Sequence, residues 1–303
     1  MRWDDRVYGE TAIDDPGLLA LIATPTFQRL AGIRQAGPSA LAFPFKTVTR
    51  FEHSLGVHVL LRRLGADRKE QVAGLLHDVS HTAFSHAIDF LVDSEEQDHH
   101  EDLKPRFLAR PDLAGAIEAL GFRVADFVDD SVFPLLERPL PWLCADRVDY
   151  FLRDAITCRV IDQPTAWRFL EHLVVVDGMI AFDDLDVARR AVDRYAVMNR
   201  DWWASPTEAF LYNEFADALL EAMRVGALGA RDLLTDDAAV MAKLEASGNP
   251  VIAEKLARVR RFEPANLAGF VPRVVPKERR IDPPVIKDGQ LRRLSDWDRS
   301  SVP

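Results

Sequence analysis

The segment Ala73-Gly-Leu-Leu-His-Asp-Val-Ser-His81 ends an apolar helical run with His77 and Asp78, two adjacent side chains that can both bind a metal ion. Neighbouring residues on an α-helix point about 100° apart. Both side chains can therefore serve one ion only where the helix ends and other segments meet it. The sequence predicts a helical fold in which further ligands come from distant parts of the chain.

Helical periodicity extends on both sides of this segment. From Phe51 to Leu64, apolar residues recur at helical spacing, and residues 39–49, rich in aromatic residues and proline, are expected to form a loop. Further helices are expected at 16–30 (interrupted at Pro25), 70–76, 88–92, 102–108, 112–120, 141–157, 187–198, 210–225, 238–246 and 251–259.

The hydrophobic period changes between Leu173 and Phe182. Two apolar runs flank Asp177-Gly178, a signal for a type I′ turn, so a β-hairpin is expected. The chain beyond residue 270 contains several prolines and a second Asp-Gly pair, which is typical of irregular strand and loop. We expect one helical domain over residues 1–270 and a Pro-rich tail over residues 271–303 that packs on it.

Composition narrows the class of function. The 303 residues are 48% hydrophobic and 28% charged, which is typical of a globular protein with a sizeable core. Thirty-eight basic residues against 48 acidic ones give a net charge of −10. Binding to a nucleic-acid backbone depends on clustered Lys and Arg, so this balance argues against a nucleic-acid partner, although a local basic groove is still compatible with it.

The cysteines and the N-terminus indicate a reducing, cytoplasmic location. Cys144 and Cys158 have no CxxC partner, so free buried thiols are expected rather than a zinc knuckle or a disulfide. The first residues are polar and charged, unlike a signal peptide, and no run of 18 apolar residues predicts a membrane span.

Two other segments can supply the missing ligands. His53 shares a helix face with apolar residues, a position that taken alone also fits a core histidine bonded to a backbone carbonyl. Asp146 shares a helix face with Tyr150 and Asp154, which alone also fits a solvated face of Asp–Arg pairs. Together, two imidazoles and two carboxylates suit Fe, Mn, Co, Ni or Zn and leave positions open for water. The predicted metal ligands are His53, His77, Asp78 and Asp146.

This set, with its adjacent His-Asp, resembles the signature of the HD phosphohydrolases. The flanking sequence resembles the deoxynucleoside triphosphate triphosphohydrolases of the SAM-and-HD-domain type, over their HD domain only. The matching segments are Thr26-Phe-Gln-Arg-Leu30, Gly32-Ile-Arg-Gln35, Arg50-Phe-Glu-His-Ser-Leu-Gly-Val57, Leu76-His-Asp78, Phe84-Ser-His86, Asp149-Tyr-Phe151 and Arg153-Asp154. The resemblance implies an all-α HD-domain fold with a small β-hairpin and an irregular, Pro-rich C-terminal tail. It also implies a nucleotide substrate and a homo-oligomer.

The resemblance assigns further roles residue by residue. A histidine–acid layer beside the phosphates is implied for His81, His86, Asp89 and His100, the last preferred over His99 because Glu101 follows it. Contacts to the phosphates or the sugar of the substrate are implied for Gln35, Arg50, Arg147, Tyr150, Asp154 and Tyr212.

The chain departs from the family pattern between Asn199 and Tyr212. This segment is about two residues longer than in the family, and no arginine aligns with the phosphate-binding Arg expected there. Arg200 is the candidate that could replace it from a shifted position. If it does not, a monophosphate, a diphosphate or a modified nucleotide becomes the alternative substrate. A smaller departure is Ser80, where the family often has glycine.

The expected chemistry is metal-dependent hydrolysis of a nucleotide, with a deoxynucleoside triphosphate as the first choice. A metal ion would polarise a phosphoryl oxygen and activate the water that attacks phosphorus. Histidines 81, 86 and 100 could move protons, because imidazole titrates at about 6.5, and Asp89 could orient one of them. A second ion, Mg²⁺, could bind with the substrate phosphates.

Other interpretations of the sequence remain open. A phosphodiesterase or nuclease could use the same metal site, and a non-catalytic nucleotide-sensing module could keep it without turnover. Two basic clusters, Arg258–Arg261 and Lys277–Arg280, fit either a solvated surface or an oligomer contact or allosteric nucleotide site.

Overall fold

A computed structural model describes residues 1–91 and 99–297 of the chain. The fold is predominantly helical with small β-sheets, which confirms the predicted fold class. The helices are α1 Pro16–Ile22, α2 Pro25–Gln28, α3 Ser39–Ala42, α4 Arg50–Arg63, α5 Arg68–Leu76, α6 His99–Leu108, α7 Pro111–Ala119, α8 Ala145–Thr157, α9 Gln163–Glu171, α10 Leu185–Met198, α11 Pro206–Arg224, α12 Asp237–Ala246, α13 Pro250–Arg260 and α14 Leu294–Trp297. The strands are β1 Arg2–Asp5, β2 Gly9–Ala12, β3 Leu173–Val176, β4 Met179–Phe182, β5 Pro284–Lys287 and β6 Gln290–Arg293.

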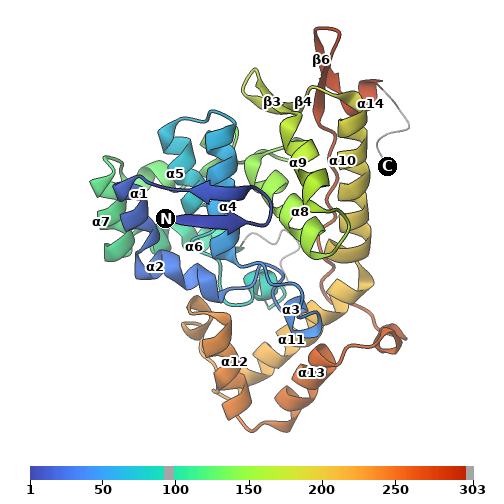
Figure 1. Ribbon diagram of the computed structural model, residues 1–303. Coiled ribbons are helices and arrows are strands. Elements are labelled where there is room, and N and C mark those ends of the chain that lie inside the picture. The colour runs from blue at the N-terminus through green and yellow to red at the C-terminus, as the bar shows by residue number, and fades with distance from the viewer. Residues whose placement is uncertain (92–98, 298–303) are drawn as a thin grey trace.

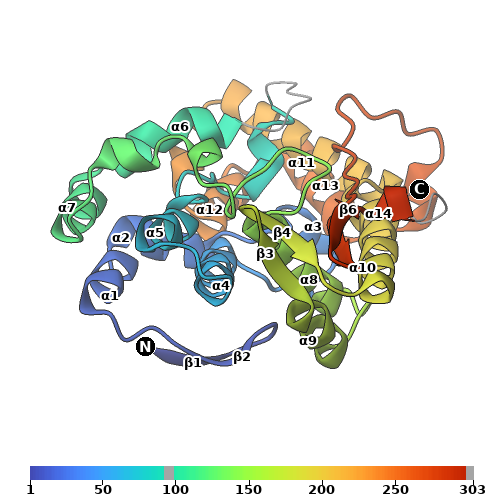
Figure 2. The same ribbon diagram turned by 90° about the horizontal axis from the view of Figure 1, so that it is seen from above.

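Helix α4 lies at the centre, packed against α5 on one side and α8 on the other (Figure 1). Helices α8, α9 and α10 form one flank of the molecule, and α11 packs against α13 below them. Seen from above, the β1–β2 hairpin lies at the opposite edge from α11 and α13 (Figure 2). The central position of α4 brings residues from three distant parts of the chain together.

Local sequence explains where α4 and α5 begin and how closely they pack. The side chain of Thr49 accepts a hydrogen bond from the backbone N–H of Glu52, and Asp67 does the same for Glu70. Gly74 permits the close approach, because a Cβ at this position would lie 2.5 Å from Cδ1 of Leu61. The end of α5 is therefore held firmly against α4.

The predicted hairpin is present as β3–β4, with Asp177 and Gly178 at φ values of 50° and 69° in the turn. The tail forms a second hairpin, β5–β6, which turns at Asp288 and Gly289. Phe182 of β4 pairs in parallel with Val285 of β5, so the two hairpins make one four-stranded sheet. The division of the chain at about residue 270 stays a prediction.

Several predicted boundaries differ from the structure. Residues 39–49 contain the short helix α3, which follows Pro38, so the loop prediction is wrong for this turn. Helix α8 begins at Ala145 rather than at residue 141, because Cys144 has extended backbone angles and precedes the first turn. A 3-10 turn, Ser85–Ile88, replaces the helix expected at 88–92, and residue 92 lies outside the described residues. Strands β1 and β2 and helix α9 were not predicted.

None of the helices in residues 1–91 and 99–297 combines the length and the apolar character needed to cross a bilayer.

Candidate metal centre

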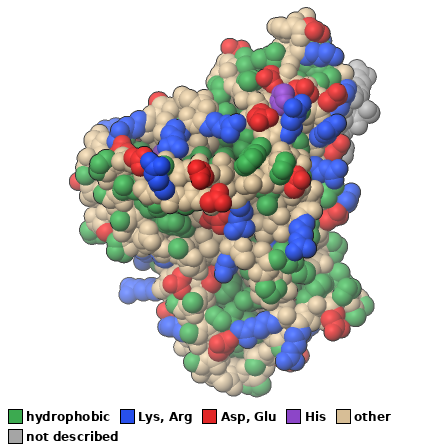
Figure 3. Space-filling model, viewed as in Figure 1, with side chains coloured by type: hydrophobic (Ala, Val, Ile, Leu, Met, Phe, Trp, Pro, Cys, Tyr) green, Lys and Arg blue, Asp and Glu red, His purple; other side chains and the backbone are tan. Residues whose placement is uncertain are grey.

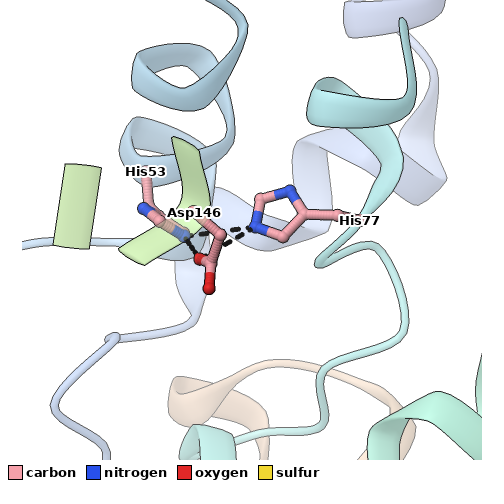
Figure 4. A group of neighbouring side chains, drawn as sticks. All are labelled: His53, His77 and Asp146. Atoms are coloured by element: carbon pink, nitrogen blue, oxygen red, sulfur yellow. Dashed lines mark hydrogen bonds and ion pairs between the residues drawn. The ribbon is translucent and has the colours of Figure 1, made fainter. Parts of the chain in front are cut away.

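His53, His77 and Asp146 point toward one another from three separate elements (Figure 4). His53 comes from α4, His77 follows the last residue of α5, and Asp146 lies in the first turn of α8. Nε2 of His53 is 2.8 Å from Oδ1 of Asp146 and 3.2 Å from Nε2 of His77. His77 is the C-cap residue of α5 and keeps helical backbone angles, with φ −55° and ψ −40°, so its side chain leaves the end of the helix toward α4 and α8.

The hydrogen bond made by Nδ1 of each imidazole determines which tautomer the ring adopts and therefore how Nε2 can interact. Nδ1 of His77 donates to the backbone carbonyl of Gly74 at 2.8 Å, and Nδ1 of His53 donates to Oδ2 of Asp149 at 2.7 Å. Both acceptors can only accept, so each Nδ1 carries a proton and each Nε2 faces Asp146 either as a second N–H or, once deprotonated, as a lone pair. Two deprotonated Nε2 atoms and a carboxylate that converge on one point would offer three ligand atoms to a cation. The three residues therefore fit a divalent metal ion held by nitrogen and oxygen ligands.

Electrostatics at the site favour positive charge. Burial lowers the pKa of His53, but the bonds to Asp146 and Asp149 outweigh it and raise that pKa to about 10. For Asp146, burial is likewise outweighed, and the bonds to His53 and His77 lower its pKa. The site thus stabilises positive charge, whether that charge comes from a protonated imidazole or from a bound metal ion.

Asp78 lies beside this group but also has other partners. Its carboxylate oxygens are 3.5 Å from Nε2 of His77 and 3.7 Å from Nε2 of His53. The guanidinium of Arg50 donates to Oδ2 of Asp78 at 2.8 Å, and Nε2 of His81 is 3.2 Å from Oδ1. The predicted fourth ligand is thus within reach of the site and is held by Arg50 and His81.

A buried ion network supports His53 from behind. Asp149 and Arg153 are both fully buried, and the guanidinium of Arg153 binds both oxygens of the Asp149 carboxylate at 2.9 Å. The hydroxyl of Tyr8 donates to Asp149 at 2.8 Å, and Arg153 also pairs with Glu52. Asp149 lies in a segment that matches the family, but no function was assigned to it from the sequence. Its position three residues after Asp146, on the same side of the predicted helix, was the signal that could have found it.

The predicted histidine–acid layer lies next to Asp78. Nδ1 of His86 is 2.9 Å from Oδ2 of Asp89, which is buried, and the rings of His81 and His86 lie edge to face with centroids 5.0 Å apart. The side chain of His100, the fourth predicted member, lies outside the described residues.

A pocket of about 470 Å³ opens from the metal-binding group. Six of the seven predicted substrate-binding residues line it: Gln35, Arg50, Arg147, Tyr150, Asp154 and Tyr212. Arg200 does not line the pocket, because its side chain is 70% exposed and pairs with Asp201 at 2.6 Å. The structure therefore gives Arg200 no contact with the pocket that the other six residues share.

The wall far from the metal ligands carries polar and aromatic groups. Indole Nε1 of Trp203 donates to Oδ2 of Asp154 at 2.9 Å, and Nε2 of Gln35 is 3.4 Å from Oδ1 of the same carboxylate. Burial raises the pKa of Asp154. Sequence reasoning missed other lining residues on this wall and at the mouth, namely Lys46, Trp202, Trp203, Glu208, Lys277 and Arg279. Lys277 and Arg279 lie in the basic cluster Lys277–Arg280, which the sequence did not connect with the pocket, and no spacing in the sequence connects the six residues with one another.

Comparisons with known proteins agree with this geometry. Residues 50–129 match the HD domain. The uncharacterized protein YdhJ of Bacillus subtilis is 38% identical over 261 residues, which cover 86% of this chain and 80% of that protein. The metal-dependent phosphohydrolase cns2 of Cordyceps militaris is 34% identical over 254 residues, covering 81% and 73%.

Two further matches are less extensive in sequence, one to an enzyme of known substrate and one to a solved structure. The deoxynucleoside triphosphate triphosphohydrolase SAMHD1 of Gallus gallus is 39% identical over 102 residues, but these are 29% of this chain and 16% of that protein. A hypothetical protein from Aquifex aeolicus is 20% identical, with a TM-score of 0.70 over 99% of this chain and 92% of that one. The latter likeness shows the fold alone.

Proposed function

Because the chain belongs to the HD-domain family of metal-dependent phosphohydrolases, we propose that it hydrolyses nucleotides, with deoxynucleoside triphosphates as the first substrates to test. The observation that carries this proposal is the convergence of His53, His77 and Asp146 at one end of a pocket that also exposes polar and aromatic groups. A pocket of about 470 Å³ falls in the range of small-molecule sites. The partial likeness to SAMHD1 supports the triphosphate.

The metal end of the pocket would perform the hydrolysis. His53, His77 and Asp146, with Asp78 beside them, would hold the ion, which supplies a Lewis acid for a phosphoryl oxygen and makes bound water more acidic. Asp149 keeps the proton of His53 on Nδ1 and so keeps Nε2 directed at the site.

Neighbouring groups would handle charge and protons. Asp89 holds Nδ1 of His86 at 2.9 Å, and His86 lines the pocket, where it would accept or donate a proton. Arg50, held by Asp78 and Ser85, is fixed where it can face phosphate oxygens. At the far wall, Asp154 can accept a hydrogen bond from a sugar hydroxyl while Trp203 and Gln35 hold it in place.

A nucleotide with fewer phosphates is the second candidate. The position of Arg200 favours it, because this residue is exposed, outside the pocket, and paired with Asp201. In addition, Glu208 of α11 lies in the pocket wall 3.3 Å from Nζ of Lys46, so part of the positive charge of that lysine is already neutralised before a phosphate chain binds.

The proposal is tested by phosphate release from metal-loaded protein. The panel consists of deoxynucleoside and ribonucleoside mono-, di- and triphosphates with Mg²⁺, Mn²⁺, Co²⁺ and Fe²⁺. His77→Ala serves as the blank, and His172→Ala is the matched control because His172 pairs with Asp183 outside the pocket. Turnover in the parent and in His172→Ala but not in His77→Ala supports the proposal. An inactive parent on every nucleotide with every metal contradicts it.

A further inference from the structure

Part of the C-terminal tail forms one wall of the pocket mouth. Pro276, Lys277 and Arg279 line the same pocket as the metal-binding group, although they follow Asp146 by a long stretch of chain. In Figure 1 this part of the chain leaves the region of α13 and runs up beside α10 toward β6. The segment 276–279, here called the strap, has neither helical nor strand conformation.

The strap is fixed on both sides by buried or partly buried hydrogen bonds. Before it, Oδ1 of Asn213 accepts from the backbone N–H of Val274 at 3.1 Å, and Nδ2 of Asn213 donates to the Val274 carbonyl at 2.8 Å. Within it, Oδ1 of Asn199 accepts from the backbone N–H of Arg279 at 2.8 Å. After it, the N–H of Asp282 donates to the carbonyl of Pro141 at 2.9 Å. These bonds define where the strap side chains point.

Alternate residues of the strap region face different surroundings. Lys277 and Arg279 line the pocket together with Pro276, although Lys277 is also exposed to solvent, whereas the exposed Glu278 and Arg280 do not line it and have 3.7 Å between their charged groups. A period of two is what an extended chain produces when one side lies on the protein. The basic cluster Lys277–Arg280 is therefore divided between the pocket and the surface.

The other cations of the pocket are already engaged with the protein. Arg50 pairs with Asp78 at 2.8 Å, and Nζ of Lys46 is 3.3 Å from Glu208. Arg147 donates to the carbonyls of Arg138 and Trp142 and lies 3.6 Å from Glu137. Among the Lys and Arg residues that line the pocket in the described part of the chain, Lys277 and Arg279 are the two with no carboxylate partner, and Arg279 donates to the backbone carbonyl of Lys277 at 2.9 Å.

The charge of Arg279 also reaches the phenols inside the pocket. Burial raises the pKa of Tyr150, and Arg147 and then Arg279 oppose that rise. Burial and Glu208 raise the pKa of Tyr212, which Arg50 and then Arg279 oppose. The guanidinium thus acts on two residues that were predicted from the sequence to contact substrate.

We propose that Lys277 and Arg279 bind the phosphates of the substrate that extend beyond the metal centre. They would replace the phosphate-binding arginine that the segment 199–212 lacks. Asn199, the first residue of that segment, accepts a hydrogen bond from the backbone N–H of Arg279, so the segment in which the family resemblance places an arginine helps to position Arg279. This inference rests on the proposed function in taking the anion to be a phosphate chain.

Binding of inorganic tripolyphosphate tests the strap without turnover. Isothermal titration compares the metal-loaded parent with Lys277→Ala, Arg279→Ala and the double variant, and inorganic phosphate serves as a short probe. A charge-assisted hydrogen bond to phosphate is worth about tenfold to a hundredfold in affinity. We expect each single variant to bind tripolyphosphate about tenfold more weakly and to bind inorganic phosphate nearly as the parent does.

Arg280→Ala is the matched control. It removes the same charge as Arg279→Ala, one residue further along the chain, from a side chain that lies outside the pocket. Arg279→Lys should retain part of the affinity, since lysine keeps the charge but loses the bidentate geometry. The proposal is overturned if the parent, the double variant and Arg280→Ala bind tripolyphosphate with equal affinity. It is also overturned if Lys277→Ala, Arg279→Ala and Arg280→Ala all lose the same amount of affinity.

Kinetics then separate the strap from the proposed function. If the parent hydrolyses nucleotides, the double variant should raise KM for a triphosphate far more than KM for a monophosphate, with kcat little changed. If the parent hydrolyses no nucleotide but tripolyphosphate binding still depends on residues 277 and 279, the function fails while the strap stands as an anion site. If the double variant turns over nucleotides with unchanged KM for every phosphate length, the proposed function is supported and phosphate binding by Lys277 and Arg279 is refuted.

Discussion

At the scale of single residues, two carboxylate partners determine the orientation of the His53 ring. Asp146 faces its Nε2 on the pocket side, and Asp149 accepts from its Nδ1 on the buried side. A metal-binding histidine commonly has such an outer partner, which fixes the tautomer and the direction of the ring. The role of His53 therefore depends on a carboxylate that never reaches the pocket.

We predict that Asp149→Asn lowers metal affinity by about 10- to 100-fold. The amide cannot hold both the imidazole N–H of His53 and the guanidinium of Arg153 as the carboxylate does. Metal titration by calorimetry measures the change, with Asp183→Asn as the control because Asp183 makes a similar 2.7 Å contact to His172 away from the pocket. Tyr8→Phe, which removes one neutral bond to Asp149, should have a smaller effect in the same direction. Unchanged metal affinity in a folded Asp149→Asn protein would show that the pairing has no such role.

Gly56 provides a test of the packing behind His53. A Cβ on Gly56 would lie 2.0 Å from Nη2 of Arg153 and 2.1 Å from Oδ1 of Asp149. We predict that Gly56→Ala lowers the free energy of unfolding by about 2 to 4 kcal/mol, because it forces apart a buried ion pair. Gly115→Ala, in the middle of α7 with open space around it, should instead raise it by about 0.5 to 1 kcal/mol. Urea unfolding measures both, and the idea is refuted if the two substitutions act in the same direction.

At the scale of elements, the ends of helices position the site. His77 and Asp78 follow the end of α5, Asp146 begins α8, and His86 lies in the turn Ser85–Ile88. Phe84 and Ser85, which lead into this turn, have positive φ values of 60° and 53°. Such angles are costly for residues other than glycine and persist where surrounding contacts impose them. One of those contacts comes from α12, where Asp237 accepts from the backbone N–H of Phe84 at 2.6 Å.

Asp237 should give stability a measurable pH dependence. Burial raises its pKa to about 6, although the N–H groups of Arg34 and Phe84 oppose this. An unfolded aspartate titrates near 3.9, so between about pH 4 and pH 6 the folded chain binds more protons than the unfolded one. The contribution of Asp237 to the free energy of unfolding therefore falls as pH rises through this window and stays low above it.

The Asp237→Asn variant lacks this titration. We predict that its free energy of unfolding, compared with that of the parent, becomes relatively more favourable as pH rises from about 4.5 to 7. Urea unfolding at several pH values measures the difference, and Asp186→Asn, at an exposed carboxylate, corrects for the loss of one charge. A difference that is constant with pH would contradict the prediction.

Periodicity predicted the elements with a long apolar face and missed those without one. Helices α4, α5, α10 and α11 and the β3–β4 hairpin were expected close to their observed bounds. Strands β1 and β2 carry mostly polar residues and have only each other as partners, so their sequence has no alternation to detect. The turn at Ser85 depends on contacts with α12 and Arg34, which no local pattern contains.

At the scale of the whole molecule, the predicted metal ligands connect three parts of the chain that are distant in sequence. His53, His77 and Asp146 were predictable because each lies in a motif that matches a known family. Lys277 and Arg279 were not predictable as pocket residues, because their position depends on how the tail docks against Asn199 and Asn213. Acidic and basic side chains are interspersed on the face shown in Figure 3, so the pattern of charge on this face does not reveal the site.

Metal binding should stabilise the fold as a whole. A ligand that binds only the folded state at a hundredfold excess over its Kd adds about 2.7 kcal/mol. We predict a lower melting temperature after treatment with a chelator and recovery on addition of the metal, measured by calorimetry. His77→Ala should melt at the same temperature with or without metal, whereas His172→Ala should respond as the parent does. A metal-dependent shift that survives in His77→Ala would place the ion elsewhere.

The location of the strap has a consequence for a chain that is still being synthesised. Residues 53, 77 and 146 leave the ribosome well before residues 277 and 279, so a nascent chain in which the helices around these three residues had packed would have the metal-binding group before the basic residues. A nascent chain at that stage could already capture its ion, but it would lack the basic wall at the pocket mouth. Metal capture and substrate retention would therefore be acquired at different times, and a partly made protein would hold a metal without holding on to nucleotides.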